Sequence, residues 1–163
     1  MDEESGFRLV KYSASSGGKI ISLRKGDEEF AYVRYFRAGL RSCLIDFMFS
    51  DRSKLPNAQF REEYSISPAK YLLEELVRKG FRTFSYSFCG WPGVALSNSL
   101  DRSGLTEFCP GKDGFSGHKA SKKFIYQAFS REKKVPREPS ALARHAGKLV
   151  PPKVRDFVKR LRK

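Results

Sequence analysis

Two adjacent lysines at the expected start of a helix are the residues best suited to chemistry, here the binding of an anion. Residues 117–131 read GHKASKKFIYQAFSR, and Lys122 and Lys123 directly follow Ser121, a residue type favoured as a helix N-cap. An apolar stripe at helical spacing follows, made of Phe124, Ile125, Ala128 and Phe129. A helix N-terminus already carries partial positive charge, so two cations there favour an anionic ligand such as phosphate. The alternative is that both lysines are simply solvated, as charge runs commonly are.

The charge of the chain is concentrated in its last third. The net charge is +14 and the isoelectric point about 9.9. Residues 111–163 contain 16 Lys or Arg against 4 Asp or Glu, whereas residues 1–110 contain 16 against 14. Such a balance favours a polyanionic partner, nucleic acid first and an anionic membrane surface second.

Composition indicates a folded protein of a reducing compartment. Hydrophobic residues make up 40% of the 163 residues and aromatic residues 13%, enough to form a core. The three cysteines, Cys43, Cys89 and Cys109, are odd in number and form no CxxC pair, which is typical of free thiols. The N-terminus is acidic and unlike a secretory signal, and no apolar run is long enough to span a membrane. We therefore expect a cytoplasmic or nuclear location.

The first part of the chain has the pattern of an antiparallel β-meander. Four β-prone segments, 7–12, 19–24, 30–37 and 41–49, are separated by turn-forming residues, and residues 51–64 are polar and irregular. This N-terminal sheet could also serve as the interface of a homodimer.

A helix, three strands and a second helix are expected next. Ser67, Pro68 and Gly80 supply a cap, a first turn and a stop for the first helix. Residues 83–89, 94–100 and 105–109 then predict three strands, residues 110–117 a loop, and the segment after Ser121 the second helix. Beyond residue 134 the chain is broken by prolines and ends in a short basic amphipathic helix.

This order resembles the double-stranded RNA-binding domain. Pro68, Leu72 and Glu74 match the pattern of the family's first helix, and the Trp91-Pro92-Gly93 loop falls where the family has its Gly-Pro loop. Ser121-Lys122-Lys123 matches the start of the family's second helix.

The resemblance implies a three-point contact with an A-form duplex. Glu74 would approach one minor groove and Pro92 the next, while Lys122 and Lys123 would bridge the phosphates between them, over about 16 base pairs. The sequence departs from the family at Tyr126, where the family has a third lysine. We expect His118, Lys119 and the basic tail to compensate, the tail through Lys153, Arg155, Lys159 and Arg160.

The sequence signals for a catalytic or metal site are weaker than those for nucleic-acid binding. The sequence contains no GxSxG, HExxH or phosphate-binding glycine loop. Cys89, Cys109 and His118 could supply three zinc ligands, but their spacing matches no standard zinc finger. Acidic pairs such as Glu74-Glu75 could hold Mg²⁺ in a nuclease, although such pairs are usually surface charge. Trp91 could stack on a base or pack in the fold.

The sequence therefore predicts an α+β protein without catalytic residues, metal or cofactor. It has an N-terminal antiparallel β-meander (1–65), an α-β-β-β-α module like the double-stranded RNA-binding domain (66–134) and a basic helical C-terminal extension (135–163). The expected function is non-enzymatic, largely sequence-independent binding of double-stranded or structured RNA. The alternatives are a structural nucleoprotein component, associated with the ribosome or a virion, and a metal-dependent nuclease.

Overall fold

Seven strands form one continuous sheet in the computed structural model, which describes residues 6–86, 104–110 and 116–138. The strands are β1 (Phe7–Ser13), β2 (Lys19–Lys25), β3 (Glu28–Arg37), β4 (Ser42–Ser50), β5 (Thr83–Tyr86), β6 (Thr106–Pro110) and β7 (Ser116–Ala120). Their order in the sheet is β1-β2-β3-β4-β5-β7-β6. All neighbours are antiparallel except β4 and β5, which are parallel.

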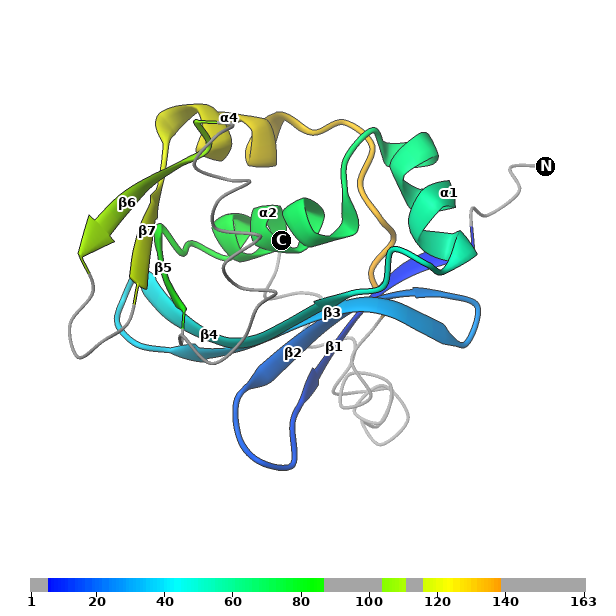
Figure 1. The fold of residues 1–163 in the computed structure, drawn as a ribbon, viewed down its shortest axis with the longest axis horizontal. Helices are drawn as coiled ribbons and strands as arrows, with labels where there is room; N and C mark the ends of the chain where they lie inside the picture. Colours follow the sequence, from blue (N-terminus) through cyan, green and yellow to red (C-terminus); the bar gives the residue numbers. More distant parts are fainter. Residues whose placement is uncertain (1–5, 87–103, 111–115, 139–163) are drawn as a thin grey trace, which may run out of the picture.

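The helices described lie on one side of this sheet, as Figure 1 shows. They are α1 (Leu55–Tyr64), α2 (Pro68–Arg78) and α4 (Lys122–Ser130). Alternate residues of β1–β4, such as Leu9, Leu23, Val33 and Ile45, are buried against them. The opposite face of β1–β4 carries partly exposed side chains, because successive residues of a strand point to opposite sides.

Two β-bulges interrupt the alternation in this half of the sheet. Between the pairs Leu23↔Ala31 and Arg24↔Glu29, the ladder skips Phe30, whose side chain is fully buried in the core. Between Arg34↔Phe47 and Tyr35↔Ile45, it skips Asp46. Both bulges change which side chains share a face, as an extra residue in one strand must.

Residues 51–64, expected to be irregular, contain helix α1. Pro56 lies in its first turn, and Phe60 and Tyr64, four residues apart, are buried and stack with ring centroids 4.6 Å apart. This spacing of two aromatic residues after a proline was the signal in the sequence. Helices α1 and α2 together make the crossover that a parallel pair such as β4 and β5 requires.

Helix α2 confirms the expected start and stop signals. The Ser67 hydroxyl accepts a hydrogen bond from the Lys70 amide at 3.3 Å, Pro68 is the first helical residue, and Gly80 follows the end with φ +105°.

Ser121 caps α4 in the same way, accepting from the Phe124 amide at 3.1 Å. In α4 the expected apolar stripe is only partly buried, since Phe124 and Ala128 are inside but Phe129 is 51% exposed.

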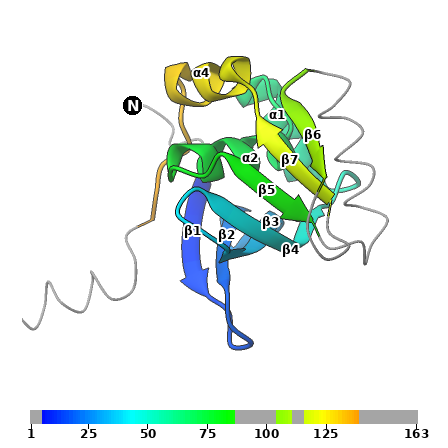
Figure 2. The same ribbon diagram turned by 90° about the vertical axis from the view of Figure 1, so that its left-hand side faces the viewer.

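The topology contradicts the expected fold class. A double-stranded RNA-binding module would have its own sheet with three strands paired in chain order. Here β5 pairs with β4 of the N-terminal half and with β7, while β6 lies outside β7 at the sheet's edge (Figure 2). The prediction of a separate meander followed by such a module is therefore wrong. The segment 94–100, expected to be a strand, lies outside the described residues.

Strand β7 replaces part of the expected loop over 110–117. Its sequence, SGHKA, has no β-branched or large aromatic residue, so local propensity does not predict a strand. It forms because β5 and β6 pair with it on both sides. The boundaries expected at residues 65/66 and 134/135 stay a prediction, although strands from both sides of residue 66 share this sheet.

The chain returns to the far edge of the sheet after α4. The Leu9 amide donates to the Pro136 carbonyl at 2.8 Å, and the Glu138 amide donates to the Leu9 carbonyl at 2.9 Å. Val135 is buried, and its amide donates to the Tyr71 hydroxyl at 2.9 Å. Residues 135–138 thus cover part of the β1 edge, which would otherwise present unpaired backbone groups.

We expect Gly18→Ala to lower the free energy of unfolding by about 2 kcal/mol. Gly18 has φ +79°, and an added Cβ would lie 2.9 Å from the Cζ atom of Phe36. Gly26→Ala is the matched control, because Gly26 has φ +60° but no atom within 4 Å of an added Cβ. Urea unfolding should show a larger loss of free energy of unfolding for Gly18→Ala than for Gly26→Ala. Equal losses in the two variants would contradict a role for the Phe36 contact.

Candidate functional site

A cleft of about 460 Å³ lies where the β1–β2 turn, the end of β3 and the residues after α2 meet. Ten residues line it: Ser13, Ala14, Gly17, Gly18, Lys19, Tyr35, Phe36, Arg37, Lys79 and Phe81. Three of the ten are cations and none is a carboxylate. We call this site the basic cleft. Its volume is within the range of small-molecule sites.

The β-sheet register positions the cations of the basic cleft. Lys19 begins β2 and is paired with Tyr35, so both side chains lie on the helix side of the sheet. Lys79 reaches the same side as the C-cap of α2. Arg37 ends β3; its Nη1 donates to the Leu40 carbonyl at 2.9 Å, and its guanidinium lies 4.8 Å from the Phe81 ring centroid. All three cations are exposed, and Arg37 is held in place by these two contacts.

Gly17 and Gly18 allow Phe36 to form part of the wall. Both glycines have positive φ, +92° and +79°, and the Phe36 ring lies against them. A side chain at Gly18 would occupy the position of the ring. The cleft therefore offers an apolar surface beside its cations.

The region behind the cleft carries more positive than negative charge. Burial first, and then the charges of Lys79 and Arg137, lower the pKa of Lys11 from 10.5 to about 8, and Glu75 opposes this. Burial first, with Lys19 and Arg137 contributing, also lowers the pKa of Lys79. Lys11 also lies 3.8 Å from the Glu75 carboxylate, which supplies the opposing charge. An anion in the basic cleft would relieve this repulsion.

This shift predicts that stability rises with pH above about 8. Between about 8 and 10.5 the unfolded chain keeps the Lys11 proton that the folded chain has lost, so the free energy of unfolding increases with pH. Below about 8 both states are protonated, and Lys11 contributes no pH dependence. Lys11→Met should remove this part of the rise. Urea unfolding should therefore show a larger stability advantage of the variant over the wild type at pH 7 than at pH 10. An equal stability difference at the two pH values would contradict the shift.

A second cleft, of about 570 Å³, lies between α2 and α4 and is lined in part by Glu74 and Arg131. Glu74 is only 1% exposed, and Arg131 binds both of its carboxylate oxygens, at 2.6 and 2.8 Å. Arg78 adds a contact at 3.3 Å. This hydrogen bonding raises the pKa of Arg131. Arg131 and Glu74 thus already neutralise each other, and Lys70 is the remaining charged residue among those that line this cleft.

The structure separates the residues that the sequence grouped as one site. Lys122 and Lys123 are exposed in the first turn of α4, whereas Glu74 is buried against Arg131 beyond the helix's other end. Nine helical residues, about 13 Å at 1.5 Å per residue, lie between those ends. His118 on β7 is fully buried, with its Nδ1 atom 3.5 Å from the Thr106 hydroxyl. Lys119 is exposed and lies opposite Glu107 in the sheet.

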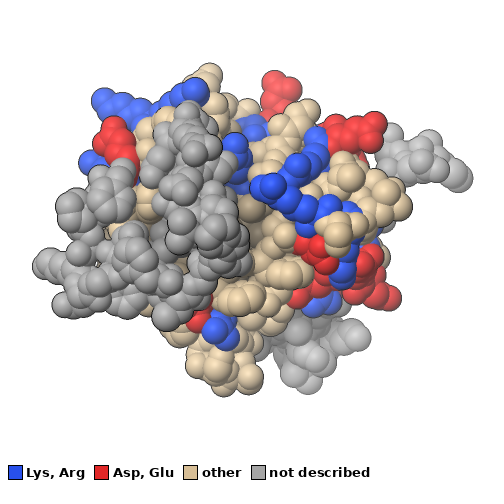
Figure 3. Space-filling model, in the orientation of Figure 1, with Lys and Arg blue, Asp and Glu red and all other residues tan. Residues whose placement is uncertain are grey.

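The other predicted site residues belong to segments that the structure does not describe. Trp91, Pro92, Lys153, Arg155, Lys159 and Arg160 lie outside the described residues. On the face shown in Figure 3, the Lys and Arg side chains of the described part are interspersed with Asp and Glu.

Thiols and acids of the described residues form no reactive cluster. Burial raises the pKa of Cys43 to about 12, so this thiol is protonated and unreactive at neutral pH. Within residues 6–86, 104–110 and 116–138, no three His, Cys, Asp or Glu side chains gather in a way that could hold a metal. None of the helices described there is long and apolar enough to cross a membrane.

Comparisons with known proteins give matches at the level of solved structures. No family model matches the sequence, and no curated protein matches it. One similar structure is a probable acetyltransferase of the GNAT family from Chromobacterium violaceum, with a TM-score of 0.39 and 13% identity over 62% of this chain and 56% of that one. Another is a ribosomal-protein-alanine N-acetyltransferase from Brucella melitensis, with a TM-score of 0.39 and 17% identity over 65% and 70%.

A third similar structure is an acetyltransferase from Thermus thermophilus, with a TM-score of 0.37 and 9% identity over 61% of each chain. The chain thus spans less than two thirds of the length of the Chromobacterium and Thermus proteins.

These findings correct the hypotheses drawn from the sequence. The resemblance to the double-stranded RNA-binding domain is wrong, because the strands after α2 belong to the seven-stranded sheet and do not pair with one another in chain order. Non-enzymatic RNA binding fails with it, since that function depended on the module. None of the three similar structures reported above is described as a nucleoprotein or a nuclease.

Sequence reasoning missed the basic cleft. Its residues come from three separate stretches, 13–19, 35–37 and 79–81, and only the register of β2 and β3 and the end of α2 bring them together. The one local signal was Gly17-Gly18-Lys19, a flexible turn followed by a cation.

Proposed function

We propose that the protein binds a small organic anion in the basic cleft. The observation that carries this proposal is a cleft of about 460 Å³ lined by Lys19, Arg37 and Lys79 and, among the described residues, by no carboxylate. A phosphate or carboxylate group would face the cations, and the body of the ligand would lie against Phe36. Charge-assisted hydrogen bonds of this kind contribute about 1.5–3 kcal/mol each.

The lowered pKa of Lys79 supports an anionic ligand over a neutral one. Burial first, and then the neighbouring cations Lys19 and Arg137, disfavour the charged form of Lys79. A bound anion reverses that effect, so binding should be linked to proton uptake near the pKa of Lys79 or Lys11. A neutral ligand would gain nothing from this arrangement.

Isothermal titration calorimetry with paired probes tests the proposal. Phenyl phosphate and phenol share a ring but differ in charge, and coenzyme A is added because acetyl transfer is the activity that the descriptions of the similar structures name. We expect saturable binding of at least one phosphate-bearing probe, with a Kd below about 1 mM, and none of phenol. Equal binding of both ring compounds, or no saturable binding of any anion, would refute the proposal.

A further inference from the structure

The face of β1–β4 turned away from the helices carries an exposed aromatic cluster. Tyr32 lies between Phe47, with ring centroids 5.6 Å apart and nearly parallel rings, and Phe49, at 5.5 Å. Phe47 is 45% exposed, and Tyr12 on the edge strand is 40% exposed. We call this surface, centred on Tyr32, Phe47 and Phe49, the open sheet face. None of the three helices described covers it (Figure 1).

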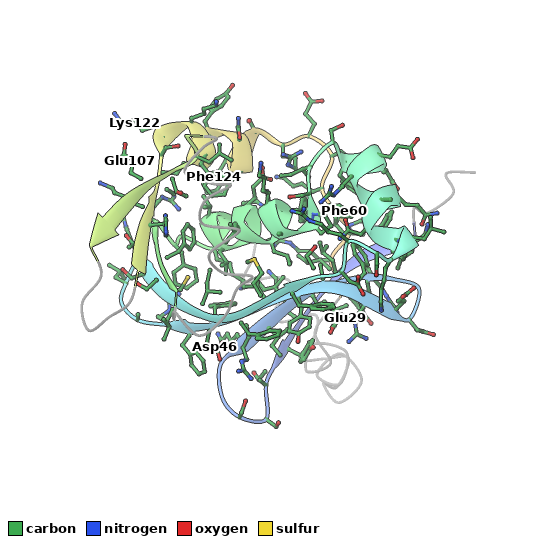
Figure 4. All side chains as sticks on the ribbon, viewed as in Figure 1. Glu29, Asp46, Phe60, Glu107, Lys122 and Phe124 are labelled. Atoms are coloured by element: carbon green, nitrogen blue, oxygen red, sulfur yellow. The ribbon has the colours of Figure 1, made fainter. Side chains whose placement is uncertain are left out.

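The β-bulge at Asp46 is what places Phe47 on this face. In a regular ladder Asp46 and Phe47 would point to opposite sides. Because the ladder skips Asp46, its carboxylate bonds Arg34 at 2.6 Å while Phe47 stacks on Tyr32, so both neighbours lie on the open sheet face. Figure 4 shows the labelled Asp46 and Glu29 on the side of the sheet away from the labelled Phe60 and Phe124. A bulge in mid-sheet that exposes a phenylalanine indicates a surface with a partner.

The charges around the aromatic cluster are balanced. Arg34 pairs with Asp46, and Glu29 accepts from Arg24 at 3.4 Å and from the Tyr12 hydroxyl at 3.2 Å. Two cations therefore flank the cluster together with two carboxylates, in a chain whose net charge is +14. Such a face attracts neither a strongly acidic partner nor a phosphate backbone. A second copy of the same face is compatible with this balance, because a two-fold axis through the Arg34–Asp46 pairs would set each cation beside the carboxylate of the other copy.

We propose that the open sheet face is the interface of a two-fold homodimer, in which the aromatic clusters of two copies pack against each other. The sheets would pack about 10 Å apart, with Arg34 of each copy facing Asp46 of the other. Four strands about 4.8 Å apart give a face roughly 20 Å wide. With strands of seven residues at about 3.3 Å per residue, the area of this face is roughly 450 Å², well below the roughly 800 Å² per partner of a standard interface, so the dimer should be weak and dependent on concentration.

Sedimentation velocity of the full chain, over an approximately hundredfold range of protein concentration, tests this interface. The wild type should shift from monomer to dimer. Phe47→Lys should weaken association at least tenfold, because it would bury a charge at the interface. Tyr126→Lys is the control, since Tyr126 is 74% exposed on α4. Circular dichroism should show unchanged folding of both variants, and Tyr12→Lys substitutes for Phe47→Lys if that variant is unstable.

Charge-swapped variants test the two-fold pairing itself. Arg34→Asp places two acids on the open sheet face and Asp46→Arg places two cations there, so each variant alone should remain monomeric. An equimolar mixture should associate, because each protein then supplies the charge that the other lacks.

Either of two results would overturn the proposal. A wild type that stays monomeric over the whole range would assign the open sheet face to a different protein. Equal weakening by Phe47→Lys and Tyr126→Lys would place self-association elsewhere on the molecule.

Discussion

Replacing Glu74 by Gln should destabilise the protein by about 3–5 kcal/mol, the largest effect on stability that we expect from an isosteric substitution. The Glu74 carboxylate is 1% exposed and receives Arg131 at 2.6 and 2.8 Å and Arg78 at 3.3 Å. These contacts join α2 to the end of α4, and Arg131 also donates to the Tyr64 carbonyl at 3.2 Å. Removing the negative charge leaves the largely buried Arg131 guanidinium without its carboxylate partner, whereas Arg78 keeps Glu75 at 2.6 Å.

Glu63→Gln is the matched control for this loss. Glu63 pairs with Lys133 at 3.0 Å, but the Lys133 side chain is 58% exposed. Exposed pairs contribute about 0–1 kcal/mol. Urea unfolding should therefore separate the two variants clearly. Similar small losses of free energy of unfolding in Glu74→Gln and Glu63→Gln would show that the contacts of Glu74 do not hold α2 and α4 together.

Reversing two charges of the basic cleft should abolish anion binding. In the double variant Lys19→Glu, Lys79→Glu, two of the three cations of the cleft become acids, and we expect affinity for phenyl phosphate to fall by about a hundredfold or more. Both side chains are exposed, so the fold should tolerate the change. Calorimetry of the wild type and the variant at the same ionic strength measures the difference.

The pair Lys122→Glu, Lys123→Glu controls for net charge. It makes the same change in total charge on the exposed first turn of α4, away from the lining of the basic cleft. Affinity should stay within about twofold of the wild type, because distant surface charges are screened by salt. An equal loss in both double variants would mean that binding follows overall charge, with no defined site.

Local signals in the sequence predicted the helices and strands whose ends and buried faces depend on residues close by in the chain. Ser67, Pro68 and Gly80 bound α2, Ser121 caps α4, and four alternating segments correspond to β1–β4. In each of these elements the residue types themselves satisfy the backbone or define the buried face. Helix α1 carried a similar signal in Pro56, Phe60 and Tyr64, which the polar composition around it obscured.

Non-local pairing accounts for what the sequence did not predict. Strand β7 has no strand propensity and forms between β5 and β6, and β5 joins β4 in parallel across two helices. The consecutive pairing that a small module would have was therefore the wrong choice among several compatible with the same elements. Glu74 illustrates the consequence for the site, because its partner Arg131 is 57 residues away and only the fold brings them together.

The basic cleft shows the same limit. Lys19, Tyr35 and Lys79 are unremarkable as separate residues in a chain with 32 Lys and Arg. Their grouping depends on the β2–β3 register and on where α2 ends. The adjacent pair Lys122-Lys123 attracted attention because its charges are neighbours in sequence, whereas those of the cleft are neighbours only in space.

A nuclear magnetic resonance titration of the backbone amides with phenyl phosphate tests the anion site most directly. We predict saturable shifts at Gly17, Gly18 and Lys19, with further shifts at Lys79 and Phe81, which line the same cleft. Shifts confined to Lys122, Lys123 and their neighbours on α4, or shifts that never saturate, would contradict a binding site in the basic cleft.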